Sequence, residues 1–212
     1  YSNTTATFNT AFGREALRNT TTAINNNAFG YSALRNNNNN NNNAFGYAAL
    51  YENTSGGANC AFGHNALNAN TTASNNTAVG ETCLYSNTTA SNNTAVGYYA
   101  LVANTTGAEN TALGFNALAA NTTGNYNTGI GQGALDSLTT ASFNVALGWN
   151  AGHNLTTGGN SIAIGANALD AATTQGANVA IGYNASTNLV TTGVTAIGYQ
   201  AMATSTTGYD TV

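Results

Sequence analysis

The feature that most constrains this chain is a glycine that returns every 16 or 17 residues along the sequence. An apolar residue always stands directly before this glycine, and alanine precedes the apolar residue in every unit except at Gly129. The repeating glycines are Gly13, Gly30, Gly46, Gly63, Gly80, Gly97, Gly114, Gly131, Gly148, Gly165, Gly182 and Gly198. So regular a period indicates a repeat architecture, in which each unit has the same local fold and contacts its neighbours.

Three further positions of the unit keep their chemical character. Asparagine usually stands four residues before the glycine, alanine or cysteine three residues after it, and leucine usually four residues after it. We expect the glycine to occupy a sharp corner where a Cβ is unwelcome or a positive φ is required. The asparagines are expected to form amide ladders. These columns are represented by Gly80, Gly97, Gly114, Asn76, Asn93 and Asn110.

Eight consecutive asparagines, residues 36–43, look out of context like a polar linker. They lie between Gly30 and Gly46, which are 16 residues apart, so they fill the turn portion of one unit. That unit is one residue shorter than most, which predicts a slightly tighter turn. Residues 1–212 are therefore interpreted as a single repeat array without an internal domain boundary, and as a segment of a longer fibre because the array begins and ends inside a unit.

The length of the unit selects the fold class. Seventeen residues are too few for two helices and a turn, and asparagine, threonine and glycine suit helices poorly. The apolar parts are two short pieces, such as "NTAVG" and "YAL", which we expect to form short β segments between turns. The sequence therefore predicts an all-β protein, a parallel β-solenoid (β-roll or β-helix) of about twelve coils stacked at a strand spacing of ~4.8 Å.

Alternation along the first apolar piece predicts two unlike faces. The alanine and asparagine columns point to one side of the strand, and the threonine and apolar columns point to the other. The lumen of a coil can bury only one side. We expect the other side to pack against a neighbouring chain, which indicates an oligomer about the rod axis.

The repeated motif also carries a family resemblance. The stretches from Asn93 to Leu101 and from Ser161 to Leu169 resemble the head repeats of trimeric autotransporter adhesins and the tail-fibre repeats of bacteriophages and other viruses. The resemblance covers essentially the whole chain, although this unit is longer than that of most adhesin heads. It implies a homotrimer of parallel β-rolls that is extracellular, on a cell surface or virion, and that acts in attachment.

Composition excludes several kinds of partner. Only 5% of residues are charged, the net charge is −4, and the sequence lacks lysine and proline. The absence of a basic patch argues against nucleic acid and anionic membranes as partners. No apolar run approaches the ~20 residues of a membrane helix, so we expect no membrane insertion of this segment. Cys60 and Cys83 are interpreted as small buried replacements rather than a disulfide or metal site.

Catalytic residues are not evident. His64 and His153 fall about five coils apart, and we expect no cysteine or carboxylate beside either. The acidic residues are scattered, so neither a carboxylate pair nor a calcium cage is evident. The sequence therefore predicts a protein that is not an enzyme and needs no cofactor.

The position after the glycine is rich in aromatic residues. Stacked along a rod, their rings can cover the seams between coils or subunits, and we favour this interpretation; a surface that binds a glycan is the alternative. His64 shares this column, which is interrupted by Arg14, Glu81, Gln132 and Ala166. The candidate recognition residues are Tyr31, Tyr47, Tyr98, Phe115, Trp149, Tyr183 and Tyr199.

Threonine pairs form another column in the middle of the unit. Stacked threonines on a flat solenoid face are the design of ice-binding proteins. We favour a turn column whose hydroxyls bond to neighbouring backbone, because the adjoining glycines indicate a turn. The first members of the pairs are Thr71, Thr88, Thr105, Thr122, Thr139, Thr156 and Thr173.

A stiff rod without evident catalytic residues favours a mechanical function. We expect a structural and adhesive segment of a fibre that attaches to a host cell or surface, with a cell-surface glycan or protein as its receptor. Two alternatives stay open: a self-assembling extracellular filament or sheath, and an ice-binding solenoid that uses the threonine column.

Overall fold

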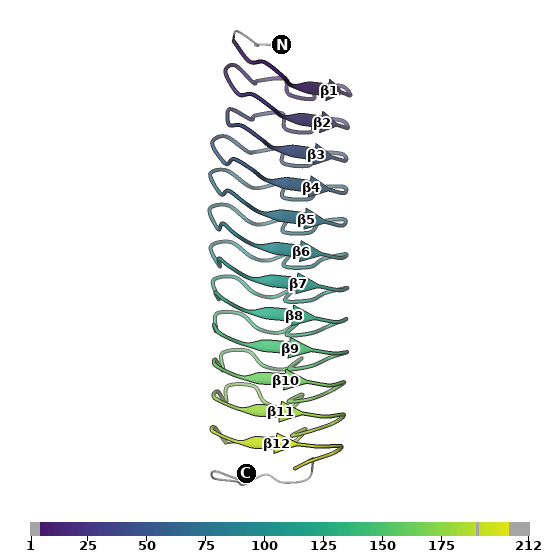
Figure 1. Ribbon diagram of the computed structural model, residues 1–212, viewed down its shortest axis with the longest axis vertical. Helices are drawn as coiled ribbons and strands as arrows, with labels where there is room; N and C mark the ends of the chain where they lie inside the picture. Colours follow the sequence, from purple (N-terminus) through teal and green to yellow (C-terminus); the bar gives the residue numbers. More distant parts are fainter. Residues whose placement is uncertain (1–4, 190, 204–212) are drawn as a thin grey trace.

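The computed structural model describes residues 5–189 and 191–203. Within these ranges the chain contains no helix and forms twelve short parallel strands, which are stacked in chain order in one sheet (Figure 1). The strands wind into a β-solenoid of about eleven turns, so the predicted fold class is confirmed at this level. They are β1 (Thr10–Phe12), β2 (Asn27–Phe29), β3 (Asn43–Phe45), β4 (Cys60–Phe62), β5 (Thr77–Val79), β6 (Thr94–Val96), β7 (Thr111–Leu113), β8 (Thr128–Ile130), β9 (Val145–Leu147), β10 (Ile162–Ile164), β11 (Val179–Ile181) and β12 (Thr195–Ile197).

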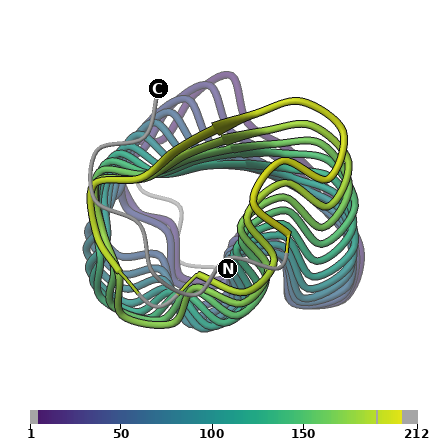
Figure 2. The same cartoon turned by 90° about the horizontal axis from the view of Figure 1, so that it is seen from below.

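The strands pair in the register that the repeat predicts. Ala78 of β5 pairs with Ala95 of β6, which pairs with Ala112 of β7, and the residues on both sides of each alanine follow the same register. Viewed along the rod, the coils superpose as one closed, lobed outline (Figure 2). Equivalent residues of successive units therefore lie above one another, one strand spacing apart.

The two faces of the strands differ as expected. The central alanine of a strand, such as Ala78, is fully buried inside the coil, whereas Thr77 and Val79 on either side of it point outward and are partly or largely exposed. Alanine and leucine after the glycine complete the core, as at Ala100 and Leu101. The core is thus a set of apolar columns inside the coil, and the strands form one of its walls.

The second apolar piece is not a β segment, and that prediction is wrong. In the unit that begins at Gly97, Tyr99 and Leu101 have positive φ values of 57° and 52° and lie in a turn. This left-handed conformation turns their amides along the rod: Tyr99 N–H donates to the carbonyl of Glu81 in the preceding coil, and Leu101 N–H to that of Ala117 in the following coil. These hydrogen bonds offset the cost of a left-handed leucine.

The glycine column occupies the corner that follows each strand, as predicted. Gly97 has a φ of +134°, which an L-residue with a side chain rarely adopts. A Cβ on Gly97 would lie 2.4 Å from the carbonyl oxygen of Gly114 in the next coil. Both the backbone conformation and the space therefore require glycine.

The asparagine run is one regular coil. Asn37 and Asn42 are fully buried in it, and the run ends at Asn43, the first residue of β3. Asn37 Nδ2 donates to the carbonyl of Asn39, so one residue separates the two. In the equivalent turns that begin at Asn70 and Asn104, two residues separate the asparagine from the carbonyl that accepts its amide. The predicted tighter turn is therefore confirmed.

Candidate functional site

The predicted asparagine column forms a ladder between side chains and backbone. The backbone N–H of Asn93 donates to Asn76 Oδ1 at 2.9 Å, and the N–H of Asn110 donates to Asn93 Oδ1 at 2.9 Å. Asn93 Nδ2 donates to the carbonyl of Gly107 at 3.0 Å. All three side chains are fully buried, and the ladder satisfies backbone donors that would otherwise lack partners inside the coil.

A second ladder, seven residues after the glycine, runs beside the first. Asn104 Nδ2 donates both to Asn87 Oδ1 and to the carbonyl of Gly107, each at 2.9 Å. The carbonyl of Gly107 therefore accepts from both ladders and links them. The residues that carry this second ladder are Asn37, Asn53, Asn70, Asn87, Asn104 and Asn121.

The second ladder stops within the rod. Leu138 stands where the next asparagine would be, and Asn121 Oδ1 is buried without a hydrogen-bond partner in the described structure. At the other end Thr20 occupies the column, and its buried Oγ1 is also without a partner there. Each end of the ladder thus holds a buried polar atom that has lost its hydrogen bonds to water without gaining a partner, which is destabilising.

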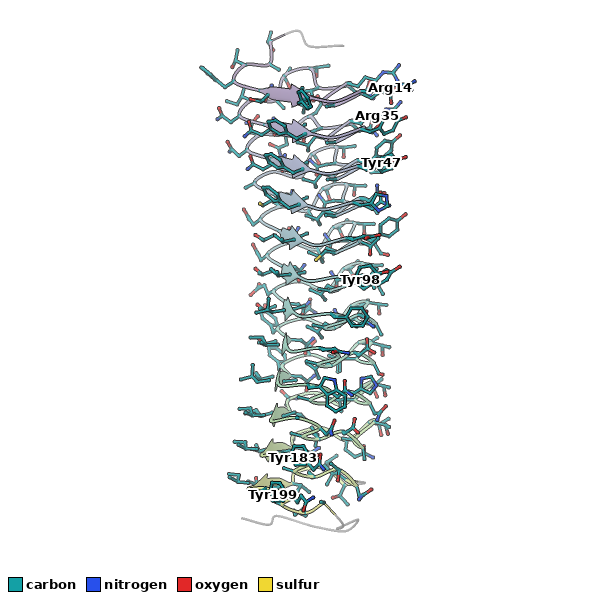
Figure 3. All side chains as sticks on the ribbon, turned by 90° about the vertical axis from the view of Figure 1, so that its right-hand side faces the viewer. Arg14, Arg35, Tyr47, Tyr98, Tyr183 and Tyr199 are labelled. Atoms are coloured by element: carbon teal, nitrogen blue, oxygen red, sulfur yellow. The ribbon has the colours of Figure 1, made fainter. Side chains whose placement is uncertain are left out.

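Aromatic residues after the glycine form short stacks rather than one continuous column. The rings of Tyr31 and Tyr47 are 5.1 Å apart with an interplanar angle of 10°. Similar pairs join Tyr98 with Phe115 and Tyr183 with Tyr199. Figure 3 shows that the column winds slowly around the rod from Tyr47 to Tyr199. Because stacked rings cover each other's faces, mainly their edges and hydroxyl groups meet solvent.

Trp149 differs from the other members of this column. Its side chain is exposed, and no aromatic ring stacks on it among the residues that the structure describes. Its neighbours in the column are Gln132 and Ala166, which explains the isolation. Glycan recognition by this column stays a prediction.

The threonine ladder lies in bends of the chain rather than in strands. Thr105 Oγ1 donates to the carbonyl of Thr122 at 3.0 Å, and Thr122 Oγ1 donates to that of Thr139 at 3.0 Å. The same bond recurs from Thr71 through Thr156. The hydroxyls therefore bridge neighbouring coils, as in the interpretation that we favoured. Ice binding stays a prediction, which a thermal-hysteresis measurement tests.

Each histidine lies beside a carboxylate, contrary to expectation. His64 Nδ1 lies 3.6 Å from Glu81 Oε1, and His153 Nδ1 lies 3.8 Å from Asp136 Oδ2. The expectation failed because it compared positions along the sequence, whereas residues 17 apart face each other in adjacent coils. Burial raises the pKa of the Asp136 carboxyl, and the charge of His153 opposes this shift. The described residues contain no group of three His, Cys, Asp or Glu able to hold a metal ion.

The two cysteines are free and differ in environment. Cys83 is fully buried in the alanine column, and burial raises the pKa of its thiol to about 12. Cys60 is the first residue of β4 and points outward, so it is only half-buried and the prediction of a buried residue is wrong for it.

Sequence reasoning missed a hollow near the start of the rod. It has a volume of about 470 Å³ and lies between Tyr31 and Tyr47 on one side and Arg35 and Tyr51 on the other. Arg35 Nη1 donates to the Tyr51 hydroxyl at 2.7 Å, and Arg35 Nε lies 3.0 Å from Glu15 Oε2. The available signal was the distribution of charge, because all three arginines of the chain lie in this part of the sequence.

In the described ranges no helix is long and apolar enough to cross a membrane.

Comparison with known proteins adds no function to this geometry. The chain matches no known protein-family model, no curated protein and no solved structure.

Proposed function

We propose that this chain is a structural and adhesive segment of an extracellular or virion fibre, which mediates attachment to a host cell or surface. The observation that carries the proposal is the continuity of bonding along the rod. Adjacent coils are hydrogen-bonded to each other through their strands and left-handed turns and, where the columns hold asparagine, through the buried ladders. A rod built in this way resists bending and keeps a surface at a fixed distance from its base.

The outward face of the sheet supports an oligomer. Phe12, Phe62, Leu113 and Ile197 are large apolar residues in the column before the glycine, and all four are exposed. Phe29, Phe45 and Phe62 stack at centroid distances of 4.7 and 4.4 Å, which adds a flat aromatic stripe. Large exposed apolar side chains that gather on one face are typical of an interaction site.

A homotrimer is the proposed oligomer, in which three chains bury their outward strand faces along a common axis. The number three rests on the resemblance of the "NTAVG" and "SIAIG" units to the repeats of trimeric adhesin heads. Three parallel chains would also repeat any receptor contact three times, which raises avidity.

The same apolar face favours a second candidate, a self-assembling filament or sheath. If rods join laterally through this face, the assembly grows beyond a closed oligomer. Discrete particles in electron microscopy would support the fibre segment, and bundles or sheets would support the filament.

The mass of the particle in solution tests the proposal together with a matched pair of variants. We expect multi-angle light scattering to give three chains per particle. Leu113→Asp, on the outward face of β7, should yield single chains, whereas Thr106→Asp, on an exposed turn of the preceding coil, should leave the trimer intact. A monomeric wild type would contradict the oligomer.

Attachment is tested with beads that carry the oligomer. We expect these beads to adhere to at least one member of a panel of bacterial, fungal and animal cells. Beads that carry an unrelated repeat protein serve as the control. Equal retention of both kinds of bead on every cell type would overturn the adhesive function.

A further inference from the structure

We infer that the hollow between Tyr47 and Tyr51 binds a neutral saccharide. The inference deepens the proposed attachment function, since it names the chemical class of receptor and the place on the rod where it is held. Figure 3 shows Arg14, Arg35 and Tyr47 following one another along one edge of the rod. We call this site the tyrosine hollow.

The floor of the tyrosine hollow explains why it forms in this place. Ser32 and Ala48 occupy the position two residues after the glycine, where the adjacent coils carry the larger Glu15 and Asn65. Two consecutive small side chains leave space between the flanking columns. Because Ser32 and Ala48 are themselves buried, the floor is fixed by the coil and not by mobile side chains.

The walls of the hollow are held in position by contacts between coils. Tyr47 is stacked on Tyr31 on one wall, and the Arg35 guanidinium lies 5.4 Å from the centroid of the Tyr51 ring on the other. The Tyr51 hydroxyl accepts a hydrogen bond from Arg35 Nη1, which leaves its own hydrogen for a ligand. A preformed wall lowers the ordering cost of binding.

Charge selects a neutral ligand over an acidic one. Glu15 and Glu52 line the hollow together with one cation, Arg35. Arg35 is paired with Glu15, which also accepts from Arg18 at 2.8 Å. Glu52 accepts from the Asn36 amide at 3.1 Å and has no ion-pair partner in the part of the chain that the structure describes. The lining residues therefore offer no unpaired cation to a phosphate or an acidic sugar.

The polar groups suit a ligand that is rich in hydroxyls. The Glu52 carboxylate can accept from two hydroxyls. Asn68 Nδ2 already donates to the Ala48 carbonyl and to Asn65 Oδ1, which leaves Asn68 Oδ1 as an acceptor and Asn65 Nδ2 as a donor for the ligand. Tyrosine edges supply the apolar contact for the C–H groups of a sugar ring. A volume of about 470 Å³ is within the range of small-molecule sites.

The test uses substitutions that the repeat itself supplies. Asparagine is common at the position of Ala48 in other coils and tolerates its left-handed conformation, so Ala48→Asn should fold and fill the floor. Thr82→Asn introduces the same residue in the same column outside the hollow. Each protein is applied to an array of neutral and acidic oligosaccharides, and the best neutral binder is titrated by calorimetry.

We expect the wild type and Thr82→Asn to bind a neutral oligosaccharide equally well, and Ala48→Asn to bind at least tenfold more weakly. Binding to acidic glycans alone, no binding to any glycan, or equal binding by Ala48→Asn would overturn the inference. Bead adhesion separates this result from the proposed function. If beads adhere equally with Ala48→Asn and the wild type, attachment stands and the saccharide site fails; if the saccharide binds but no beads adhere, the site stands and attachment fails.

Discussion

Two parts of the rod share one backbone and differ in what fills it. In the coils that follow β2 to β7, the column seven residues after the glycine is asparagine and its side chains form a ladder. In the coils that follow β8 to β11 the same column holds Leu138, Leu155, Ala172 and Leu189, all buried. We call these the asparagine region and the leucine region.

The leucine region compensates for its larger side chains. Where Leu155 replaces asparagine, the leucine expected three residues earlier is Gly152, and where Leu189 does so it is Ser186. In the coil between them Leu169 is retained and Ala172 fills the other column. In these three coils core volume is therefore conserved by exchanging large and small residues between two columns, as close packing requires. The coil that follows β8 does not make this exchange, because Leu135 and Leu138 are both buried in it.

This comparison separates two tasks of the core. Filling the coil can be done by amides or by methyl groups, since both regions have the same strand register. The ladder also fixes the position of each coil relative to the next, because each amide needs a hydrogen-bond partner in the adjacent coil.

The glycine corner should matter equally in both regions, and this is the largest expected effect. Gly97→Ala in the asparagine region and Gly165→Ala in the leucine region each place a Cβ within 2.4–2.5 Å of a carbonyl oxygen at positive φ. We expect each to cost more than about 3 kcal/mol of unfolding free energy. Urea unfolding followed by circular dichroism measures it, and a much smaller loss for one of the two would show that the regions differ in backbone as well as in filling.

Breaking the ladder in its middle should cost more than shortening it. Asn87→Leu removes the donor to Asn70 Oδ1 and the acceptor of Asn104 Nδ2, so we expect a loss of about 2–4 kcal/mol. Asn121→Leu moves the existing unpaired carbonyl from Asn121 to Asn104. It also removes one bond to the carbonyl of Gly124, which still accepts from Asn110 Nδ2, so the change should stay within about 1 kcal/mol. Equal losses in urea titrations would mean that the ladder is not a connected unit.

The reverse exchange tests the leucine region. Leu155→Asn places an amide between Leu138 and Ala172, where the ladder offers no partner in either adjacent coil. We expect a loss of about 2 kcal/mol, from unmet hydrogen bonds and reduced apolar burial. Leu155→Met is the control and should cost less than about 1.5 kcal/mol because it conserves volume. Thermal melting of both variants decides whether the region demands apolar residues or merely tolerates them.

The smallest expected effect is on the pH dependence of stability, and it comes from Asp136 in the leucine region. Burial raises the pKa of the Asp136 carboxyl, so the folded chain holds this proton more firmly than the unfolded chain. The resulting stability is present at low pH and is lost as pH rises through the folded pKa. We expect Asp136→Asn to remove a small part of the pH dependence of the urea midpoint between about pH 3 and about pH 7. A wild type that gains stability relative to Asp136→Asn as pH rises through this range would contradict this sign.

The regular part of this structure could be predicted from the sequence because spacing alone determines it. The glycine corner at Gly97 and the buried side chain of Asn93 follow from a column that hardly varies. The left-handed Leu101 could not be predicted, since leucine disfavours that conformation and only bonds between coils stabilise it. The hollow depends on departures from the repeat, such as Ala48, which the period does not predict, whereas the contact of His64 with Glu81 follows from their spacing of one unit.

The uniform direction of pairing has a consequence for how such a rod changes in evolution. Every strand contacts only the strand before it and the strand after it in the chain. An in-frame duplication of seventeen codons would therefore add one coil and leave the contacts within the other coils unchanged. Length then becomes a quantity that copy-number variation in a gene can tune, by ~4.8 Å for each copy gained or lost.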